Sequence, residues 1–328
     1  MRAFFLEPFL KTIMTSKTII ITGGTGLVGT ALTRHLLANG HKIIILSRNP
    51  QKAATASSKK EGVQFAHWDV KAKTIDEQVI KEADAIIHLA GAGVVDKPWT
   101  LAYKKEIVDS RVQSAALLVK ATREIPNKIE TVVSASAIGW YGADKAGAIP
   151  FIETSPAAPG FLGDTCRKWE DSIKPVSELN KRLVICRFGI VLAKEGGALK
   201  EFIKPLKARV AGVIGNGKQM VSWIHIHDLC RMLLFAIDQP SLKGIYNAVA
   251  PLPVSNEKLT LTLAEAMHGN GFIKTNVPEF VLKIMMGERS VEVLKSTTVS
   301  SKKIETAGFE FEFPKIEQAL KNLTNDSA

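Results

Sequence analysis

The stretch Thr18-Ile-Ile-Ile-Thr-Gly-Gly-Thr-Gly-Leu-Val-Gly29 decides the fold. An apolar, β-branched run stops at a cluster of glycines, and a helical pattern begins directly after it. Strand, glycine turn and helix in this order are the context of a dinucleotide-binding fingerprint. Gly23 permits the tight turn, Gly26 lets backbone N–H groups approach a pyrophosphate, and Gly29 lets the helix pack close to the sheet. The free amides and partial positive charge of the helix N-terminus then favour phosphate binding.

The end of the next predicted strand, residues 42–46, indicates which dinucleotide binds. This strand runs into Ser47-Arg48-Asn49-Pro50, with no Asp or Glu at its end. An acidic residue there accepts from the ribose 2′-OH of NAD, whereas an Arg accommodates the 2′-phosphate of NADP. Ser47 offers a hydroxyl, and Arg48 offers a guanidinium that can hold a phosphate with two hydrogen bonds. We therefore expect NADP rather than NAD; the alternative is that Arg48 is a solvated charge in a polar loop.

Length and composition are typical of a globular protein, and the net charge is basic. The chain has 328 residues, 46% of them hydrophobic and 23% charged, which allows one large domain with a lobe or two domains. Its formal net charge of +11 comes from Lys and Arg spread along the chain, without a dense basic block or a nucleic-acid-binding motif. A basic surface equally suits an anionic small molecule such as NADP. We expect a small-molecule substrate, no nucleic acid, and a monomer or homodimer.

Cysteine use and apolar segments indicate the compartment. Cys166, Cys186 and Cys230 lie far apart without a CxxC pair, which fits a reducing compartment and argues against a disulfide framework. Residues 1–16 are faintly similar to a signal peptide, but charged residues and a proline interrupt the apolar run, so we expect a dispensable extension outside the fold. No run approaches the ~18 apolar residues of a membrane span. These features predict a cytoplasmic protein without a membrane partner.

Short β-rich runs alternate with helical patterns, as in a parallel sheet covered on both faces. This predicts an α/β fold of the Rossmann type, a doubly wound parallel sheet of about seven strands with a smaller, mostly helical substrate lobe. We assign residues 17–192 and 225–250 to an NADP-binding domain, and residues 193–224 and 251–328 to the lobe. The predicted strands are 18–22, 42–46, 63–67, 84–89, 131–135, 182–186 and 244–248, and the helices between them are 76–82, 101–124, 162–179 and 229–238, the last with Asp228 as its N-cap.

Four motifs carry a resemblance to a known superfamily. Residues 22–29 read TGxxGxxG; Asp69-Val70 follows the third strand, His88-Leu89-Ala90-Gly91-Ala92 the fourth, and Ser134-Ala135-Ser136 with Tyr141-Gly142 the fifth. This pattern resembles the extended short-chain dehydrogenase/reductases. Together with the positions derived above, the resemblance implies cofactor contacts from Gly23, Thr25, Gly26, Leu27, Val28, Gly29, Ser47, Arg48, Asp69, Val70, Leu89, Ala90, Gly91 and Ser134.

Other segments point to one branch of that superfamily. They include Ile107-Val108-Asp109-Ser110-Arg111, Gly196-Gly197-Ala198-Leu199 and Ser222-Trp223-Ile224-His225. They resemble an atypical subgroup described as NAD-dependent epimerase/dehydratase family proteins, sometimes labelled sugar-nucleotide epimerases or cell-division inhibitors. Members of this subgroup end in a small domain of unknown function, and residues 307–320 are similar to its close.

The chain lacks the catalytic pair that the resemblance leads one to expect. Active members carry a Tyr and, four residues later, a Lys on one helix face, where the Lys lowers the Tyr pKa for proton exchange during hydride transfer. Alignment puts Leu162 at the Tyr position and Cys166 at the Lys position. A literal YxxxK occurs at Tyr141 and Lys145, but in a glycine-containing loop, where residues four apart need not share a face. We interpret this second pair as coincidental.

Other side chains are candidates for the chemistry. Tyr141 is the best candidate acid, and Ser136 could hydrogen-bond a substrate carbonyl; the alternatives are a packing aromatic and a local backbone contact. The predicted substrate pocket consists of Gln219, Trp223, His225 and Arg111, the last as an anion contact or a solvated charge. His225-Ile226-His227 has no third ligand in view, so we expect no metal. Arg187 and Asp228 are predicted to form a buried ion pair.

These observations favour an NADP-dependent oxidoreductase or epimerase-like enzyme. Hydride would pass between nicotinamide and an unidentified anionic or polyol small molecule, without the usual YxxxK pair. The alternative is an NADP-binding protein with little or no turnover, acting as a redox sensor or a partner-binding module.

Overall fold

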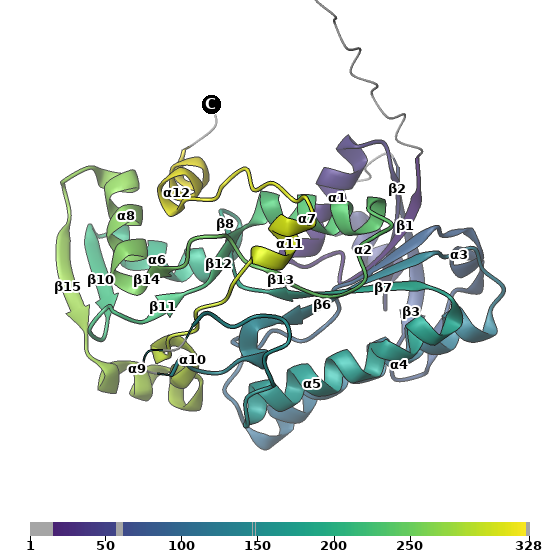
Figure 1. The fold of residues 1–328 in the computed structure, drawn as a ribbon, viewed down its shortest axis with the longest axis horizontal. Coiled ribbons are helices and arrows are strands. Elements are labelled where there is room, and N and C mark those ends of the chain that lie inside the picture. Colours follow the sequence, from purple (N-terminus) through teal and green to yellow (C-terminus); the bar gives the residue numbers. More distant parts are fainter. Residues whose placement is uncertain (1–15, 57–61, 146, 148, 326–328) are drawn as a thin grey trace, which may run out of the picture.

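A computed structural model describes residues 16–56, 62–145, 147 and 149–325. The predicted extension, except for Ser16, lies outside these residues. Within them, a central sheet contains seven parallel strands, as predicted, and one short antiparallel strand, β4, at its edge (Figure 1). The strand order is β13 (Gly244–Ala248), β7 (Arg182–Phe188), β6 (Thr131–Ala137), β5 (Ala85–His88), β1 (Thr18–Thr22), β2 (Lys42–Ser47), β3 (Val63–Asp69) and β4 (Thr74–Ile75).

Helices cover both faces of this sheet, which confirms the doubly wound Rossmann-type fold (Figure 1). The β1 strand explains how one short run supports both layers, because successive side chains point to opposite faces. Ile19 and Ile21 join the apolar cluster under α1 (Leu27–Ala38) and α7 (Ile226–Asp238). Ile20 joins the cluster on the other face, under α3 (Glu77–Glu82) and α4 (Leu101–Glu124).

The strand ends connect to helices that differ in detail from the predicted ones. The predicted helix 162–179 is an α-helix, α5 (Phe161–Ile173), that continues as the 3₁₀ helix η2 (Lys174–Leu179). The α7 helix starts earlier than predicted, and its N-cap is His225 rather than Asp228, because the His225 Nδ1 accepts from the His227 N–H. The short helices α2 (Pro50–Ala56) and η1 (Ile138–Trp140) follow β2 and β6.

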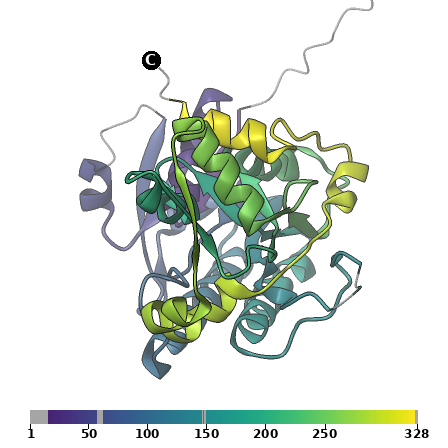
Figure 2. The same cartoon turned by 90° about the vertical axis from the view of Figure 1, so that its left-hand side faces the viewer.

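The lobe packs beside the β13 end of the sheet and contains small sheets as well as helices (Figure 1). Seen from the lobe, α8 and α12 lie side by side (Figure 2), and an ion pair of 2.7 Å joins Lys258 to Glu317 between them. The elements outside the central sheet and the helices on its faces are β8 (Ile190–Ala193), β9 (Gly196–Gly197), α6 (Ala198–Leu206), β10 (Val210–Ile214), β11 (Met220–Val221), β12 (Trp223–His225), β14 (Val254–Ser255), α8 (Asn256–His268), β15 (Ile273–Val277), α9 (Glu279–Met286), η3 (Gly287–Arg289), α10 (Ser290–Leu294), α11 (Lys302–Thr306) and α12 (Ile316–Thr324).

No helix in the described part of the chain is long and apolar enough to cross a membrane.

Candidate functional site

The glycine turn after β1 is closed tightly against its neighbours. Gly23 has φ +69°, and a Cβ there would lie 2.9 Å from the carbonyl carbon of Leu89. A Cβ on Gly29 would lie 2.3 Å from the carbonyl oxygen of Gly23, so the first turn of α1 rests directly on the glycine turn. The Gly26 N–H donates to the Gly23 carbonyl at 3.0 Å. Only glycine fits at positions 23 and 29, as the fingerprint predicts.

The N-terminus of α1 is free to accept an anion. Its N-cap, Gly26, provides no side-chain hydrogen bond, and the first turn contains no acidic residue. Thr25 and Gly26 are exposed, while Leu27 and Val28 are half-buried. Unpaired N–H groups and the helix dipole at such an end attract phosphate. The turn therefore fits the pyrophosphate of a dinucleotide.

The ends of β2 and β3 lie next to this turn. The register pairs Thr22 with Leu46, so Ser47 and Arg48 follow directly beside the end of β1. The Ser47 hydroxyl accepts from the Asn49 N–H at 3.2 Å. Arg48 is exposed, and within the described residues its guanidinium makes no hydrogen bond or ion pair. This guanidinium is thus available for a 2′-phosphate.

Asp69 closes the same edge at the end of β3. Its carboxylate accepts from the N–H groups of Lys71 and Ala72 at 2.8 and 3.0 Å, which lowers its pKa. Val70, beside it, is half-buried. The carboxylate stabilises its own turn and stays ionised at neutral pH.

His88, which belongs to a sequence motif but has no role predicted from it, is buried and holds the end of β5. His88 lies between the Thr22 hydroxyl, 2.7 Å from Nδ1, and the Ser114 hydroxyl, 3.3 Å from Nε2. Burial lowers the pKa of His88 to about 3, so the ring is neutral. The Thr22 hydroxyl also accepts from the N–H groups of Leu89 and Ala90. The backbone at 89–91 is thereby fixed next to the glycine turn.

Ligands of open α/β sheets bind in a crevice outside the carboxyl ends of the strands. Five side chains where β6, β7 and β13 border this crevice form one buried hydrogen-bonded set, here called the Arg187 network. The Ser136 hydroxyl donates to Glu170 at 2.7 Å, and Arg187 donates to both Glu170 oxygens at 2.7 and 2.9 Å. Arg187 also donates to the Tyr141 hydroxyl at 2.9 Å, and that hydroxyl donates to Asn247 Oδ1 at 2.5 Å. All five side chains are 3% exposed or less.

Strand register and parity explain this network and correct the predicted Arg187–Asp228 pair. Ser136 and Asn247 are the residues opposite Arg187 on the two neighbouring strands. Arg187 alternates with Cys186, whose side chain faces the α1 and α7 layer, so the guanidinium faces α5 and reaches Glu170. Asp228, on α7, instead pairs with Arg231 at 3.0 Å and accepts from the N–H groups of residues 312 and 313.

The candidate acid Tyr141 lies inside this network. Burial raises the pKa of Tyr141 to about 12, and its ring stacks on Phe151 with centroids 5.2 Å apart. Tyr141 follows η1, and Lys145 lies exposed in a loop, so the literal YxxxK does not share a helix face. Ser134, two residues before Ser136, is fully buried and donates to the Ala135 carbonyl.

The face of α5 next to β6 carries Leu162 and Cys166. A Cβ on Gly139 would lie 3.4 Å from the Leu162 Cβ and 3.7 Å from the Cys166 Sγ. The thiol donates to the Ala137 carbonyl at 3.6 Å, and burial raises its pKa to about 11. An aliphatic side chain and a neutral thiol therefore occupy the positions where the resemblance predicts a Tyr and a Lys.

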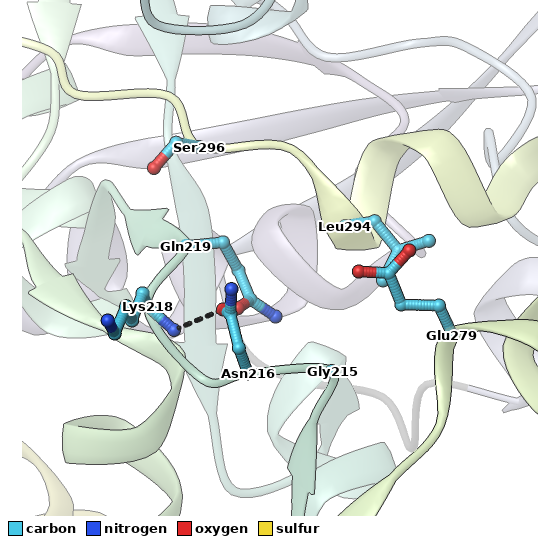
Figure 3. Close-up of a pocket in the computed structure, with 7 residues that line it drawn as sticks. All are labelled: Gly215, Asn216, Lys218, Gln219, Glu279, Leu294 and Ser296. Atoms are coloured by element: carbon cyan, nitrogen blue, oxygen red, sulfur yellow. Dashed lines mark hydrogen bonds between the residues drawn. The ribbon is translucent and has the colours of Figure 1, made fainter. Parts of the chain in front are cut away.

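The four predicted pocket residues lie in different surroundings. Gln219 lines a cavity of about 260 Å³ between the turn after β10 and the α9–α10 segment (Figure 3), with Gly215, Asn216, Lys218, Glu279, Leu294 and Ser296. The Gln219 amide donates to the Ile214 carbonyl at 3.1 Å. Trp223 is fully buried in the core and donates to the Leu252 carbonyl.

His225 and Arg111, the other two predicted pocket residues, do not line this cavity. His225 stacks on Phe313 with centroids 4.0 Å apart and lies 3.2 Å from Asn322 Oδ1, and burial lowers its pKa to about 4. Arg111 lies on α4, beside Gly91 at the end of β5. Among the described residues, no group of three His, Cys, Asp or Glu side chains is arranged to hold a metal.

Comparisons with known proteins agree with this geometry. Residues 19–162 match the model of the "NAD dependent epimerase/dehydratase family", and residues 277–323 match a domain of unknown function, DUF1731. An "epimerase family protein" of Staphylococcus aureus strain MRSA252 is 35% identical over 94% of this chain and 99% of its own length.

Two solved structures are similar over 94% of the chain. The human epimerase family protein SDR39U1 with NADPH has a TM-score of 0.81 at 28% identity, and 99% of it is covered. A nucleoside-diphosphate sugar epimerase from Corynebacterium glutamicum has a TM-score of 0.73 at 30% identity, and 58% of it is covered. A UDP-N-acetylglucosamine 4-epimerase from Methanobrevibacter ruminantium, at 18% identity and a TM-score of 0.77, shares the fold.

Proposed function

The chain belongs to the NAD-dependent epimerase/dehydratase family, in its branch of epimerase family proteins, and on that premise we propose that it is an NADP-dependent oxidoreductase or epimerase-like enzyme. When bound, the nicotinamide supplies hydride transfer with a small molecule. The residues of this chain bind and orient that cofactor. The carrying observation is the exposed, unpaired Arg48 next to a phosphate-accepting helix end.

Three features support NADP over NAD. The end of β2 has no acidic residue to accept from a 2′-OH, and Ser47 and Arg48 offer donors to a 2′-phosphate. Among the described residues the exposed Arg48 makes no hydrogen bond or ion pair that a phosphate would need to displace, although its charge helps to lower the pKa of the Asp69 carboxyl. The human relative with a TM-score of 0.81 is described with NADPH.

On the substrate side, we assign the cavity at Gln219 to an anionic or polyol small molecule. Its lining is polar, with the Gln219 and Asn216 amides facing Glu279 across the opening (Figure 3). Trp223 in the core and His225 at the start of α7 do not line this cavity. Tyr141 and Ser136 are the candidate groups for proton transfer, and their hydroxyls now serve the Arg187 network.

A second candidate function is an NADP-binding sensor or partner-binding protein with little turnover. The closed Arg187 network and the pair Leu162 and Cys166 favour it, because the Tyr141 hydroxyl is already hydrogen-bonded to Arg187 and Asn247. A metabolite screen that follows NADPH absorbance separates the two. NADPH that raises the melting temperature, while no compound oxidises it, supports the sensor and contradicts the enzyme.

The cofactor assignment is tested by Arg48→Ala. Loss of charge-assisted hydrogen bonds should weaken NADPH binding by roughly 10- to 100-fold and leave NADH binding nearly unchanged. Lys42→Ala, an exposed cation at the other end of β2, is the matched control and should affect neither. Calorimetric titration measures all three proteins. Equal losses of NADPH and NADH binding in Arg48→Ala contradict NADP.

The three cysteines are free and buried, which supports a reducing, cytoplasmic location. We keep a monomer or homodimer as the proposed assembly.

A further inference from the structure

Arg111 is a buried cation with incomplete hydrogen bonding. It projects from α4 and is 9% exposed. Its Nη1 donates to the carbonyls of Ala92 and Ile107 at 3.0 and 2.9 Å, and its Cζ lies 4.9 Å from the centre of the Trp169 ring. These contacts use one nitrogen and one face of the guanidinium.

No carboxylate of the described residues forms an ion pair with Arg111. The contrast with Arg187 is direct, because Arg187 is also buried and donates to both oxygens of Glu170. Burial lowers the pKa of Arg111, yet a guanidinium stays charged in proteins. A buried charge without a counter-ion is costly, and the cation–π contact with Trp169 compensates only part of that cost. An anion that binds there would supply the missing partner.

The free edge of the guanidinium lies at the crevice. Nε and Nη2 have no partner among the described residues, and they are not among the fully buried atoms that lack one, so this edge reaches solvent. A Cβ on Gly91 would lie 3.0 Å from Cζ, so Gly91 leaves the space that the guanidinium needs. Gly91 is itself exposed, just after β5 and next to the glycine turn. Ligands of open α/β sheets bind at this edge.

Two residues of α5 lie near Arg111: Trp169, whose ring it faces, and Cys166, at the position where the resemblance predicts a lysine. The Arg111 charge counters the rise in the Cys166 pKa, which reflects their proximity. A positive charge therefore reaches this part of the crevice from α4 instead of α5.

We propose that Arg111 is an anion-binding residue, whose free edge holds a carboxylate or phosphate of a ligand lying beside Gly91. This inference deepens the proposed function, because it assigns the residue that binds an anionic group in the same crevice. The anion belongs either to a separate small acid or to the diphosphate of the cofactor, and the chemistry at Arg111 is the same.

The test compares Arg111→Met with Arg111→Lys, and uses Lys105→Met as a control that removes an exposed charge from the same helix. NADPH-saturated protein is titrated with oxalate and with inorganic phosphate at constant ionic strength. If a separate acid binds, wild type shows saturable binding that Arg111→Met weakens on the order of tenfold or more. Arg111→Lys should lose less, because it keeps the charge without the fork. Lys105→Met should match wild type.

A second titration identifies the cofactor as the source. NADPH is compared with adenosine 2′,5′-bisphosphate, which lacks the nicotinamide half and its phosphate. Weaker binding of NADPH alone in Arg111→Met assigns the anion to the cofactor diphosphate. If Arg111→Met folds, as circular dichroism reports, and binds all four probes as Lys105→Met does, the inference is wrong.

Folding failure of Arg111→Met does not remove the test. Arg111→Lys is then decisive: unchanged binding of all four probes overturns the inference, and selective loss supports it. The Arg48→Ala experiment is independent. If Arg48→Ala loses NADPH and NADH binding equally while the Arg111 variants lose anion binding, only the NADP assignment is contradicted. If Arg48→Ala selectively loses NADPH binding while the Arg111 variants bind all four probes normally, only the Arg111 site is contradicted.

Discussion

The two ends of the crevice differ in how their polar groups are satisfied. At the α1 end, main-chain N–H groups of the helix N-terminus and the side chain of Arg48 have no partner among the described residues. At the α5 end, Ser136, Glu170, Arg187 and their partners satisfy one another inside the protein. Donors without a protein partner, here called the open end, are available to a ligand. Donors and acceptors that satisfy one another, here called the closed end, instead fix the strands and the helix that carry them.

Three arginines along the crevice differ in burial and in how fully their guanidinium groups are paired. Arg48 is exposed and unpaired, Arg111 is buried with one free edge, and Arg187 is fully buried and paired with Glu170. The same side chain therefore has three environments within one crevice. A missing counter-ion, rather than charge alone, therefore identifies a ligand contact.

Among the substitutions that test this contrast, Glu170→Gln should have the largest effect on stability. It leaves Arg187 charged and buried without its carboxylate, which should lower the free energy of unfolding by about 3–5 kcal/mol. NADPH binding should change little in the folded protein, because the α1 end stays intact. Urea unfolding and calorimetric titration measure the two quantities.

Asp171→Asn is the matched control for Glu170→Gln. Asp171 is the next residue on α5 and pairs with Lys174 at 2.5 Å on the exposed face. Exposed pairs contribute about 0–1 kcal/mol, so the control should be nearly as stable as wild type. Equal destabilisation by the two substitutions would show that the closed network is no stronger than a surface pair.

The open end could be predicted from the sequence because its determinants are local. A β-branched run, three spaced glycines and a helical pattern follow one another directly within residues 18–38, and each has its own conformational requirement. The alternation of β-rich and helical runs likewise predicted the seven parallel strands. The edge strand β4 was missed, since two residues give no periodic signal.

The closed end could not be predicted because its contacts depend on register. Tyr141 and Asn247 are 106 residues apart, and Arg187 meets Glu170 only when β7 points its odd positions toward α5. Asp228 is equally acidic and buried, but it lies on the opposite layer, which is why the predicted pair was wrong. The sequence did offer one clue: side chains alternate along a strand, so Arg187 must face the layer opposite to that of its neighbour Cys186.

The next prediction concerns Tyr141→Phe, which removes one hydroxyl from the closed end. Asn247 Oδ1 loses its donor and Arg187 loses one acceptor, so stability should fall by about 1–2 kcal/mol. NADPH binding should be unchanged, and any turnover should fall if this hydroxyl moves a proton. Tyr246→Phe, one residue from Asn247 and outside the Arg187 network, is the control. Unchanged turnover would leave Tyr141 a member of the network alone.

The smallest expected effect is on the pH dependence of stability, and it tests whether the desolvated His225 ring helps to hold the C-terminal helix α12 in place. The folded pKa of His225 is about 4, below the unfolded value of 6.5, because burial disfavours the charged ring. As pH falls below 6.5, the unfolded state binds the proton first, so stability present above that pH is lost on acidification. Between pH 6.5 and 5.5 this group should account for a loss of about 1 kcal/mol.

His225→Asn should remove that share of the pH dependence. Asn can still accept from the His227 N–H as an N-cap, so α7 keeps its cap while the titrating ring is lost. Urea unfolding of both proteins at pH 6.5 and 5.5 gives the difference in slope. A variant that loses as much stability on acidification as wild type would mean that the ring is not desolvated against Phe313 and Asn322, and that the C-terminal helix docks without this histidine.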